Sequence, residues 1–100
     1  MRERAPDSNA GAESIRLLIA EDELADVELL VRELARAGYA PEWRRVDTES
    51  SFLAELDAPI DIIVSDNSMP SFSAARALAL LKVRGMRVPF IVVSRAIGEE

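Results

Sequence analysis

The sequence predicts an α/β fold built on a parallel sheet, and its apolar pattern carries that prediction. Short aliphatic runs alternate with segments of helical periodicity in the order β-α-β-α-β-α-β, and parallel strands in such an alternation are joined by right-handed crossovers. One run, Ile62-Ile63-Val64, is a continuous apolar stretch of the kind that is buried on both faces of a parallel sheet.

The first half of the chain holds two predicted strands and one long helix. We expect residues 1 to 14 to form a mobile tail, because they mix charged residues with Ala, Gly, Pro and Ser and have no periodicity. A strand over residues 15–20 ends at three acids, and a helix closed by Gly38 follows it. A second strand covers residues 42–46. The helix has an apolar face of Leu24, Val27, Leu30, Val31 and Leu34.

The second half continues the alternation, so that residues 15–100 form one domain. Asp47 or Thr48 caps a short helix, and a strand over residues 60–65 ends at Asp66. A third helix, capped by Ser73, runs to about Arg84, and the last strand covers residues 88–94. The apolar face of the short helix is Phe52, Leu53 and Leu56.

Composition excludes several classes of function. The 100-residue chain has no cysteine and no histidine, so it cannot form a disulfide, a Cys/His zinc site or a phosphohistidine of its own. Its net charge of −6 argues against nucleic acid as a direct partner. We expect no membrane span and no secretory signal, which makes a cytoplasmic location the default expectation.

Acids follow two of the predicted strands. Glu21 and Asp22 follow the first strand, Asp66 follows the third, and Ser94 closes the fourth. With the strand order 2-1-3-4 these strand ends meet at the point where the order reverses, which is where open parallel sheets place their sites. Each acid alone is also explained by a helix dipole or a turn, but the placement of the acids and Ser94 at the ends of alternating strands favours a shared site. Crowded carboxylates of this kind suit Mg²⁺.

Three segments resemble the receiver (CheY-like) domain of two-component response regulators, and the spacing from Asp66 to Pro70 is especially similar. The resemblance covers the chain from about Ile15 onward. The segments are Leu17-Leu18-Ile19-Ala20-Glu21-Asp22-Glu23, Asp61-Ile62-Ile63-Val64-Ser65-Asp66-Asn67-Ser68-Met69-Pro70 and Val88-Pro89-Phe90-Ile91-Val92-Val93-Ser94.

The resemblance implies a flavodoxin-like three-layer sandwich and a role for each matching residue. Asp66 would be the phosphoacceptor, and Ser94 would be the switch hydroxyl. Glu21, Asp22, Asp66 and the backbone carbonyl of Ser68 would hold Mg²⁺. The domain would be no enzyme beyond its own phosphorylation, and its partner would be a sensor histidine kinase or a phosphotransfer protein.

The chain departs from the family in two ways. Receivers have five βα units and a lysine on the final strand, whereas this chain stops earlier and its Lys82 lies in the third predicted helix. We therefore expect the last βα unit and the final strand to be missing, and the chain to be a fragment or to self-associate through an exposed sheet edge. Arg95 stands where the family has a small residue; it would crowd the acceptor or supply a positive charge, and we favour crowding.

Two other functions compete with phosphoacceptance. A degenerate, non-switching receiver would act only as an interaction or dimerisation module. A phosphatase of the haloacid dehalogenase type also uses an aspartate after a strand, but it needs a second aspartate two positions later, where this chain has Ser68.

Overall fold

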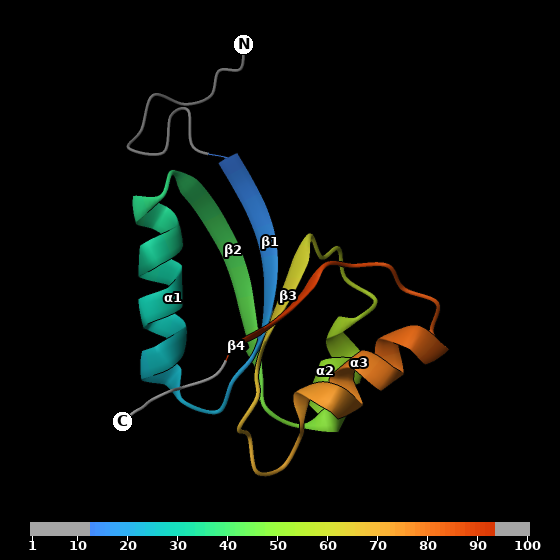
Figure 1. Cartoon of the computed structure of the whole chain (residues 1–100). Coiled ribbons are helices and arrows are strands. Elements are labelled where there is room, and N and C mark those ends of the chain that lie inside the picture. The colour runs from blue at the N-terminus through green and yellow to red at the C-terminus, as the bar shows by residue number, and fades with distance from the viewer. Residues whose placement is uncertain (1–12, 94–100) are drawn as a thin grey trace.

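Four parallel strands form a single sheet in the computed structural model, which describes residues 13–93 (Figure 1). The order β2-β1-β3-β4 is the predicted order, and the flavodoxin-like α/β class is confirmed. The strands are β1 (Glu13–Ala20), β2 (Tyr39–Val46), β3 (Ile62–Asp66) and β4 (Phe90–Val93), and the helices are α1 (Leu24–Arg36), α2 (Glu49–Glu55) and α3 (Ala74–Val83).

Helices cover both faces of the sheet, with α1 on one face and α2 and α3 on the other (Figure 1). Because alternate strand residues point to opposite faces, the central strands are apolar throughout, and the four residues Leu17 to Ala20 are all buried. The core on the α2/α3 face contains Leu18, Ala20, Val46, Phe52, Leu56, Ile63, Met69, Phe72, Ala77 and Leu81. The core on the α1 face, within residues 13–93, contains Leu17, Ile19, Val27 and Val64.

Local chemistry fixes the predicted helix ends. Gly38 and Gly85 follow α1 and α3 with φ of 101° and 70°, a left-handed conformation that glycine adopts without steric cost. The side-chain oxygen of Thr48 accepts a hydrogen bond from the Ser51 N–H and caps α2, so Thr48 and not Asp47 is the cap. Ser73 caps α3 in the same way through the Arg76 N–H.

Two strands begin earlier than predicted. β1 starts at Glu13, so Glu13 and Ser14 belong to the sheet and not to the expected tail. β2 starts at Tyr39, three residues before the predicted start at residue 42, and contains Pro41. Glu13 and Glu21 donate their N–H groups to the carbonyls of Gly38 and Val46. In a parallel ladder the even-numbered residues of β2 therefore direct their backbone N–H and C=O groups toward β1. Pro41 is odd-numbered, so its backbone groups point away from β1, where the missing N–H breaks no hydrogen bond of the sheet.

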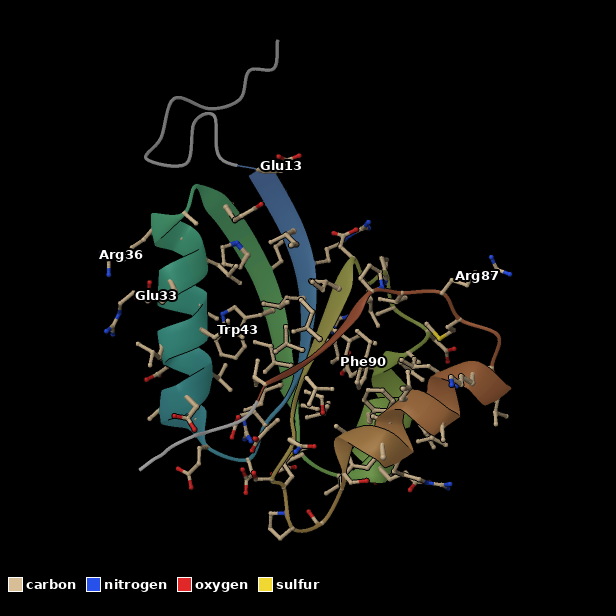
Figure 2. The ribbon with its side chains drawn as sticks, in the orientation of Figure 1. Glu13, Glu33, Arg36, Trp43, Arg87 and Phe90 are labelled. Carbon is tan, nitrogen blue, oxygen red and sulfur yellow. The ribbon has the colours of Figure 1, made fainter. Side chains whose placement is uncertain are left out.

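Two apolar side chains are less buried than their pattern predicts. Leu24 begins α1 at the rim of the sheet and is 49% exposed, whereas Val27 one turn later is buried. Trp43 lies on the edge strand β2 and stays 36% exposed (Figure 2). The remaining predicted face of α1 packs partly buried against the core. Within residues 13–93, none of the helices has the length and apolarity that crossing a bilayer requires.

Candidate functional site

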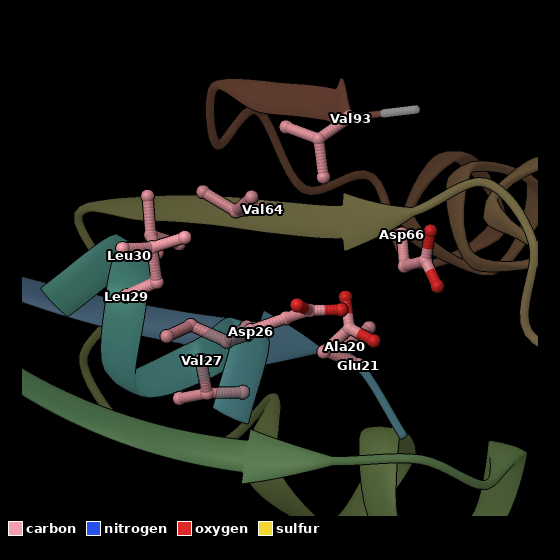
Figure 3. Close-up of a pocket in the computed structure, with 10 residues that line it drawn as sticks. Ala20, Glu21, Asp26, Val27, Leu29, Leu30, Val64, Asp66 and Val93 are labelled. Carbon is pink, nitrogen blue, oxygen red and sulfur yellow. The ribbon is translucent and has the colours of Figure 1, made fainter. Parts of the chain in front are cut away.

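The acidic residues meet where the strand order reverses. Glu21 directly follows β1 and Asp66 is the last residue of β3, and these two strands are neighbours in the sheet. The chain leaves β1 toward α1 on one face and leaves β3 toward α3 on the other face, which opens a crevice at the carboxyl ends of the strands. Figure 3 shows both side chains at this end of the sheet.

Three carboxylates lie together at this point. One oxygen each of Glu21, Asp22 and Asp66 lies within 4.8 Å of the others. Glu21 and Asp66 are 6% and 3% exposed, whereas Asp22 faces solvent. Two buried carboxylates and one exposed carboxylate offer hard oxygen ligands on one side and leave an open side for water or a substrate oxygen, which fits the preferences of Mg²⁺.

Backbone groups hold the two buried carboxylates in place. A Glu21 carboxylate oxygen accepts a hydrogen bond from the Glu23 N–H at 3.1 Å, and Asp66 Oδ1 accepts one from the Ser68 N–H at 3.2 Å. The Arg45 guanidinium donates to the backbone carbonyl of Glu21 at 3.1 Å and so ties the β1–α1 loop to β2. The acids are thus positioned by the ends of three different strands.

The cluster carries an electrostatic cost in the absence of a cation. The pKa of Glu21 is raised to about 7, chiefly by burial and also by the Asp66 charge, the Asp22 side chain and the Asp26 charge, whereas the hydrogen bond from the Glu23 N–H lowers it. A bound dication would remove this repulsion and favour the ionised form of Glu21.

An apolar pocket of about 220 Å³ adjoins the carboxylates on the α1 face of the sheet (Figure 3). Val27, Leu29 and Leu30 of α1 line one side, and strand residues line the floor. Asp26 also lines the pocket, and the sequence analysis did not single it out although it stands one helical turn after Asp22. Arg45 was missed as well, and no local signal marks its contact with the Glu21 carbonyl.

The structure thus brings Glu21, Asp22 and Asp66 together as the sequence predicted. Whether these residues and the Ser68 carbonyl hold Mg²⁺ stays a prediction. Ser94 and Arg95 lie outside the described residues, as do the expected tail over residues 1–12 and the helix start predicted at residues 98–100. Lys82 lies in α3, as expected.

The chain is similar in sequence to one transcriptional regulatory protein. No protein-family model matches it. A protein of Bacillus subtilis (strain 168), named "Uncharacterized transcriptional regulatory protein YbdJ", is 28% identical over 79 residues. The match covers 79% of this chain and 34% of that protein, so the chain spans about a third of the relative. The similarity and the parallel α/β sheet both fit a receiver-like fold of a regulatory protein.

Proposed function

We propose that this chain is the receiver module of a two-component phosphorelay and that Asp66 accepts the phosphoryl group. The observation that carries the proposal is the meeting of Glu21, Asp22 and Asp66 within 4.8 Å at the switch point of the sheet. The similarity to a transcriptional regulatory protein supports the same class. These 100 residues contain no histidine, so the phosphohistidine donor would lie outside them, in a sensor kinase or a phosphotransfer protein.

The proposed reaction is a transfer between two side chains. An Asp66 carboxylate oxygen forms a bond to phosphorus, the phosphorus–nitrogen bond of the donor phosphohistidine breaks, and the imidazole nitrogen keeps the electron pair. Glu21, Asp22, Asp66 and the Ser68 carbonyl would hold Mg²⁺, which would neutralise part of the negative charge of the reacting carboxylate and phosphoryl group. Ser94 is the proposed switch hydroxyl that bonds a phosphoryl oxygen.

The chain's own groups prepare Asp66 for this role. The Ser68 N–H occupies one Asp66 oxygen, which fixes the orientation of the carboxylate. Burial at 3% exposure limits competing water around the nucleophile. No general base is required, because the carboxylate attacks in its ionised form. The chain would accept a group and turn over nothing, so it is not proposed as an enzyme.

Phosphorylation from a small-molecule donor tests the proposal. We expect acetyl phosphate with Mg²⁺ to add one phosphoryl group to the chain, detected by intact mass, and we expect Asp66→Asn to abolish the adduct. Asp57→Asn is the matched control, because Asp57 is an exposed acid paired with Arg84 on the other side of the fold. Chelation of Mg²⁺ should prevent labelling. An adduct that survives Asp66→Asn would reject the assignment.

A second candidate is a receiver that does not switch and serves as an interaction module. The exposed apolar residues of β4 favour it, since they offer a binding surface that is independent of the acids. In that case Asp66→Asn would leave partner binding or self-association unchanged, and beryllofluoride with Mg²⁺ would produce no spectroscopic change.

A further inference from the structure

Arg45 lies at the carboxyl end of β2, on the α1 face of the sheet. It is in register with Ile19 of β1, which belongs to the α1-face core. Its neighbour Arg44 is in register with Leu18, which belongs to the α2/α3-face core. Because alternate residues of a strand point to opposite faces, the two arginines extend to opposite sides of the sheet. Arg45 alone of the two therefore reaches the β1–α1 loop, residues 21–23.

The end of β2 holds both backbone groups of Glu21. The Glu21 N–H donates to the Val46 carbonyl at 2.9 Å, and the Glu21 carbonyl accepts a hydrogen bond from the Arg45 guanidinium at 3.1 Å. The first bond continues the ladder between β1 and β2, whereas a side chain makes the second bond beyond the end of the ladder. Because a peptide unit is planar, Arg45 thereby fixes the whole peptide between Glu21 and Asp22, from which both carboxylates of the loop extend.

The charges of the loop oppose the shape that the loop adopts. Glu21, Asp22 and Glu23 are three successive acids, and the first two have oxygens within 4.8 Å of an Asp66 oxygen. Like charges at this separation repel one another, which favours a more open loop. The Arg45 bond opposes that opening. It ends on a backbone carbonyl, so it holds the loop without pairing with a carboxylate that a cation would need.

The β2–α2 loop holds Arg45 in turn. The Arg45 guanidinium lies 3.6 Å from the Asp47 carboxylate, and the Asp47 carbonyl accepts a hydrogen bond from the Ser71 hydroxyl at 3.2 Å. Ser71 belongs to the loop that follows Asp66 and leads to α3. The loops after β1, β2 and β3 are thus joined through Arg45 and Asp47, and the two sides of the acidic cluster are held relative to each other.

We propose that Arg45 is a positioning residue for divalent-cation binding, which holds the Glu21–Asp22 peptide so that two carboxylates converge on Asp66. The inference rests on the proposed function, because it requires the three acids to bind Mg²⁺. Replacing a residue that orients metal ligands without touching the metal changes metal affinity by roughly 10–100-fold. The Arg45 charge acts in the opposite direction, since a fixed cation near the site repels Mg²⁺. Positioning and charge therefore predict changes of opposite sign when Arg45 is replaced.

Arg45→Met tests the sign, because it removes the donors and the charge but keeps an unbranched side chain. The probe is Mn²⁺, which prefers the same oxygen ligands as Mg²⁺ and whose free concentration is measured by electron paramagnetic resonance. We expect Arg45→Met to bind Mn²⁺ about tenfold more weakly than the unmodified chain. The matched control is Arg44→Met, which removes the same charge from a side chain of similar exposure, 38% against 33%, paired with Glu55 on the opposite face. It should change the affinity by about twofold or less.

Two further measurements separate positioning from a general loss of stability. Arg45→Lys keeps the charge and a donor but lacks the planar guanidinium, so its Mn²⁺ affinity should lie between those of the unmodified chain and Arg45→Met. Amide hydrogen exchange needs no metal. The N–H groups of Glu21 and Glu23 are bonded to the Val46 carbonyl and the Glu21 carboxylate, and both should exchange roughly tenfold faster in Arg45→Met than in Arg44→Met, because the loop opens locally.

Mn²⁺ binding by Arg45→Met that is as tight as in the unmodified chain, or tighter, would overturn the inference. Equal losses of affinity in Arg45→Met and Arg44→Met would overturn it as well. Both outcomes leave the proposed function in place, because the unmodified chain would still bind the cation beside Asp66. An unmodified chain that binds no Mn²⁺, or an Asp66→Asn variant that binds it equally well, would instead reject the shared metal site and with it the proposed function.

Discussion

The two faces of the sheet are made by the same strands but have different roles. Among the residues that the structure describes, the α2/α3 face buries ten core residues, including Phe52 and Phe72 with ring centroids 5.1 Å apart. In the same part of the chain, the α1 face buries four core residues under one helix, and beside them lie the apolar pocket and the carboxylates. Stability is thus concentrated on one face, whereas the other face holds the features that suit binding.

Charge distribution follows the same division. On the α2/α3 side, acids are paired with arginines on the surface, as in the contact of Arg76 with Glu49 at 2.9 Å and of Arg84 with Asp57 at 2.8 Å. Near α1, Glu21 and Asp66 are buried carboxylates, and within residues 13–93 no cationic side chain pairs with their oxygens. A domain can tolerate such an unfavourable arrangement at a functional site when the opposite face supplies the stability.

The largest effect is expected for Phe52→Ala in α2. The Phe52 ring is fully buried and contacts Phe72, so removing it should lower the free energy of unfolding by about 3–5 kcal/mol. Urea unfolding measures the change. Leu78→Ala is the control, since Leu78 lies on α3 and is 38% exposed. Equal losses in the two variants would contradict a stabilising core on this face.

Val27→Ala should cost less, because it removes the one fully buried residue of α1 from the thinner core. We expect a loss of about 2 kcal/mol from the deleted methyl groups and the cavity they leave. Leu29→Ala, on the same helix at 54% exposure, is the matched control and should change stability little. A loss at Val27 as large as that at Phe52 would remove the proposed difference between the faces.

A smaller, pH-dependent effect is expected at Glu21. Its pKa is raised from 4.5 to about 7 chiefly by burial, so the folded chain keeps a proton that the unfolded chain releases. The free energy of unfolding should therefore fall as pH rises from about 4.5 to about 7 and then level off. Glu21→Gln cannot ionise and should lack this decrease.

Urea titrations of both proteins at pH 4.5, 6 and 7.5 give the two pH profiles, and their difference reports the ionisation of Glu21 together with its interaction with Asp66. Asp61→Asn is a contrasting variant: the Arg16 guanidinium lowers the pKa of Asp61 to about 2, so its contribution changes only at lower pH. Parallel pH profiles for the unmodified chain and Glu21→Gln would contradict a raised pKa. Mg²⁺ should reduce the decrease if the acids bind it.

The sequence was most informative where local chemistry decides the structure. Thr48, Ser73 and the two glycines after α1 and α3 act through hydrogen bonds and backbone angles within a few residues. The sequence predicted Ser73 as the cap of α3 and Gly38 as the end of α1, and Thr48 was one of two residues proposed to cap α2. It was less informative at the sheet edge. The start of β2 depends on Pro41 facing away from β1, and that requires knowledge of the strand order.

The candidate site divides in the same way. The acids at the ends of successive strands are visible in the sequence, and a parallel sheet brings them together. The contact of Arg45 with the Glu21 carbonyl spans 24 positions along the chain and depends on the sheet register. The pKa of Glu21 likewise depends on burial and on charges from β3 and α1, which no local pattern encodes.

The smallest effect should distinguish the starts of two helices on opposite faces. α2 begins with a capping box in which Thr48 and Ser51 exchange hydrogen bonds, whereas the N-cap of α1, Glu23, makes no side-chain cap bond. Thr48→Ala should lower the free energy of unfolding by about 1 kcal/mol. Glu23→Ala should change it by less than about 0.5 kcal/mol, because it removes no cap bond. Urea unfolding in one buffer compares them, and a larger loss at Glu23 would show that the acidic loop, with its N–H bond to Glu21, stabilises α1 more than a cap stabilises α2.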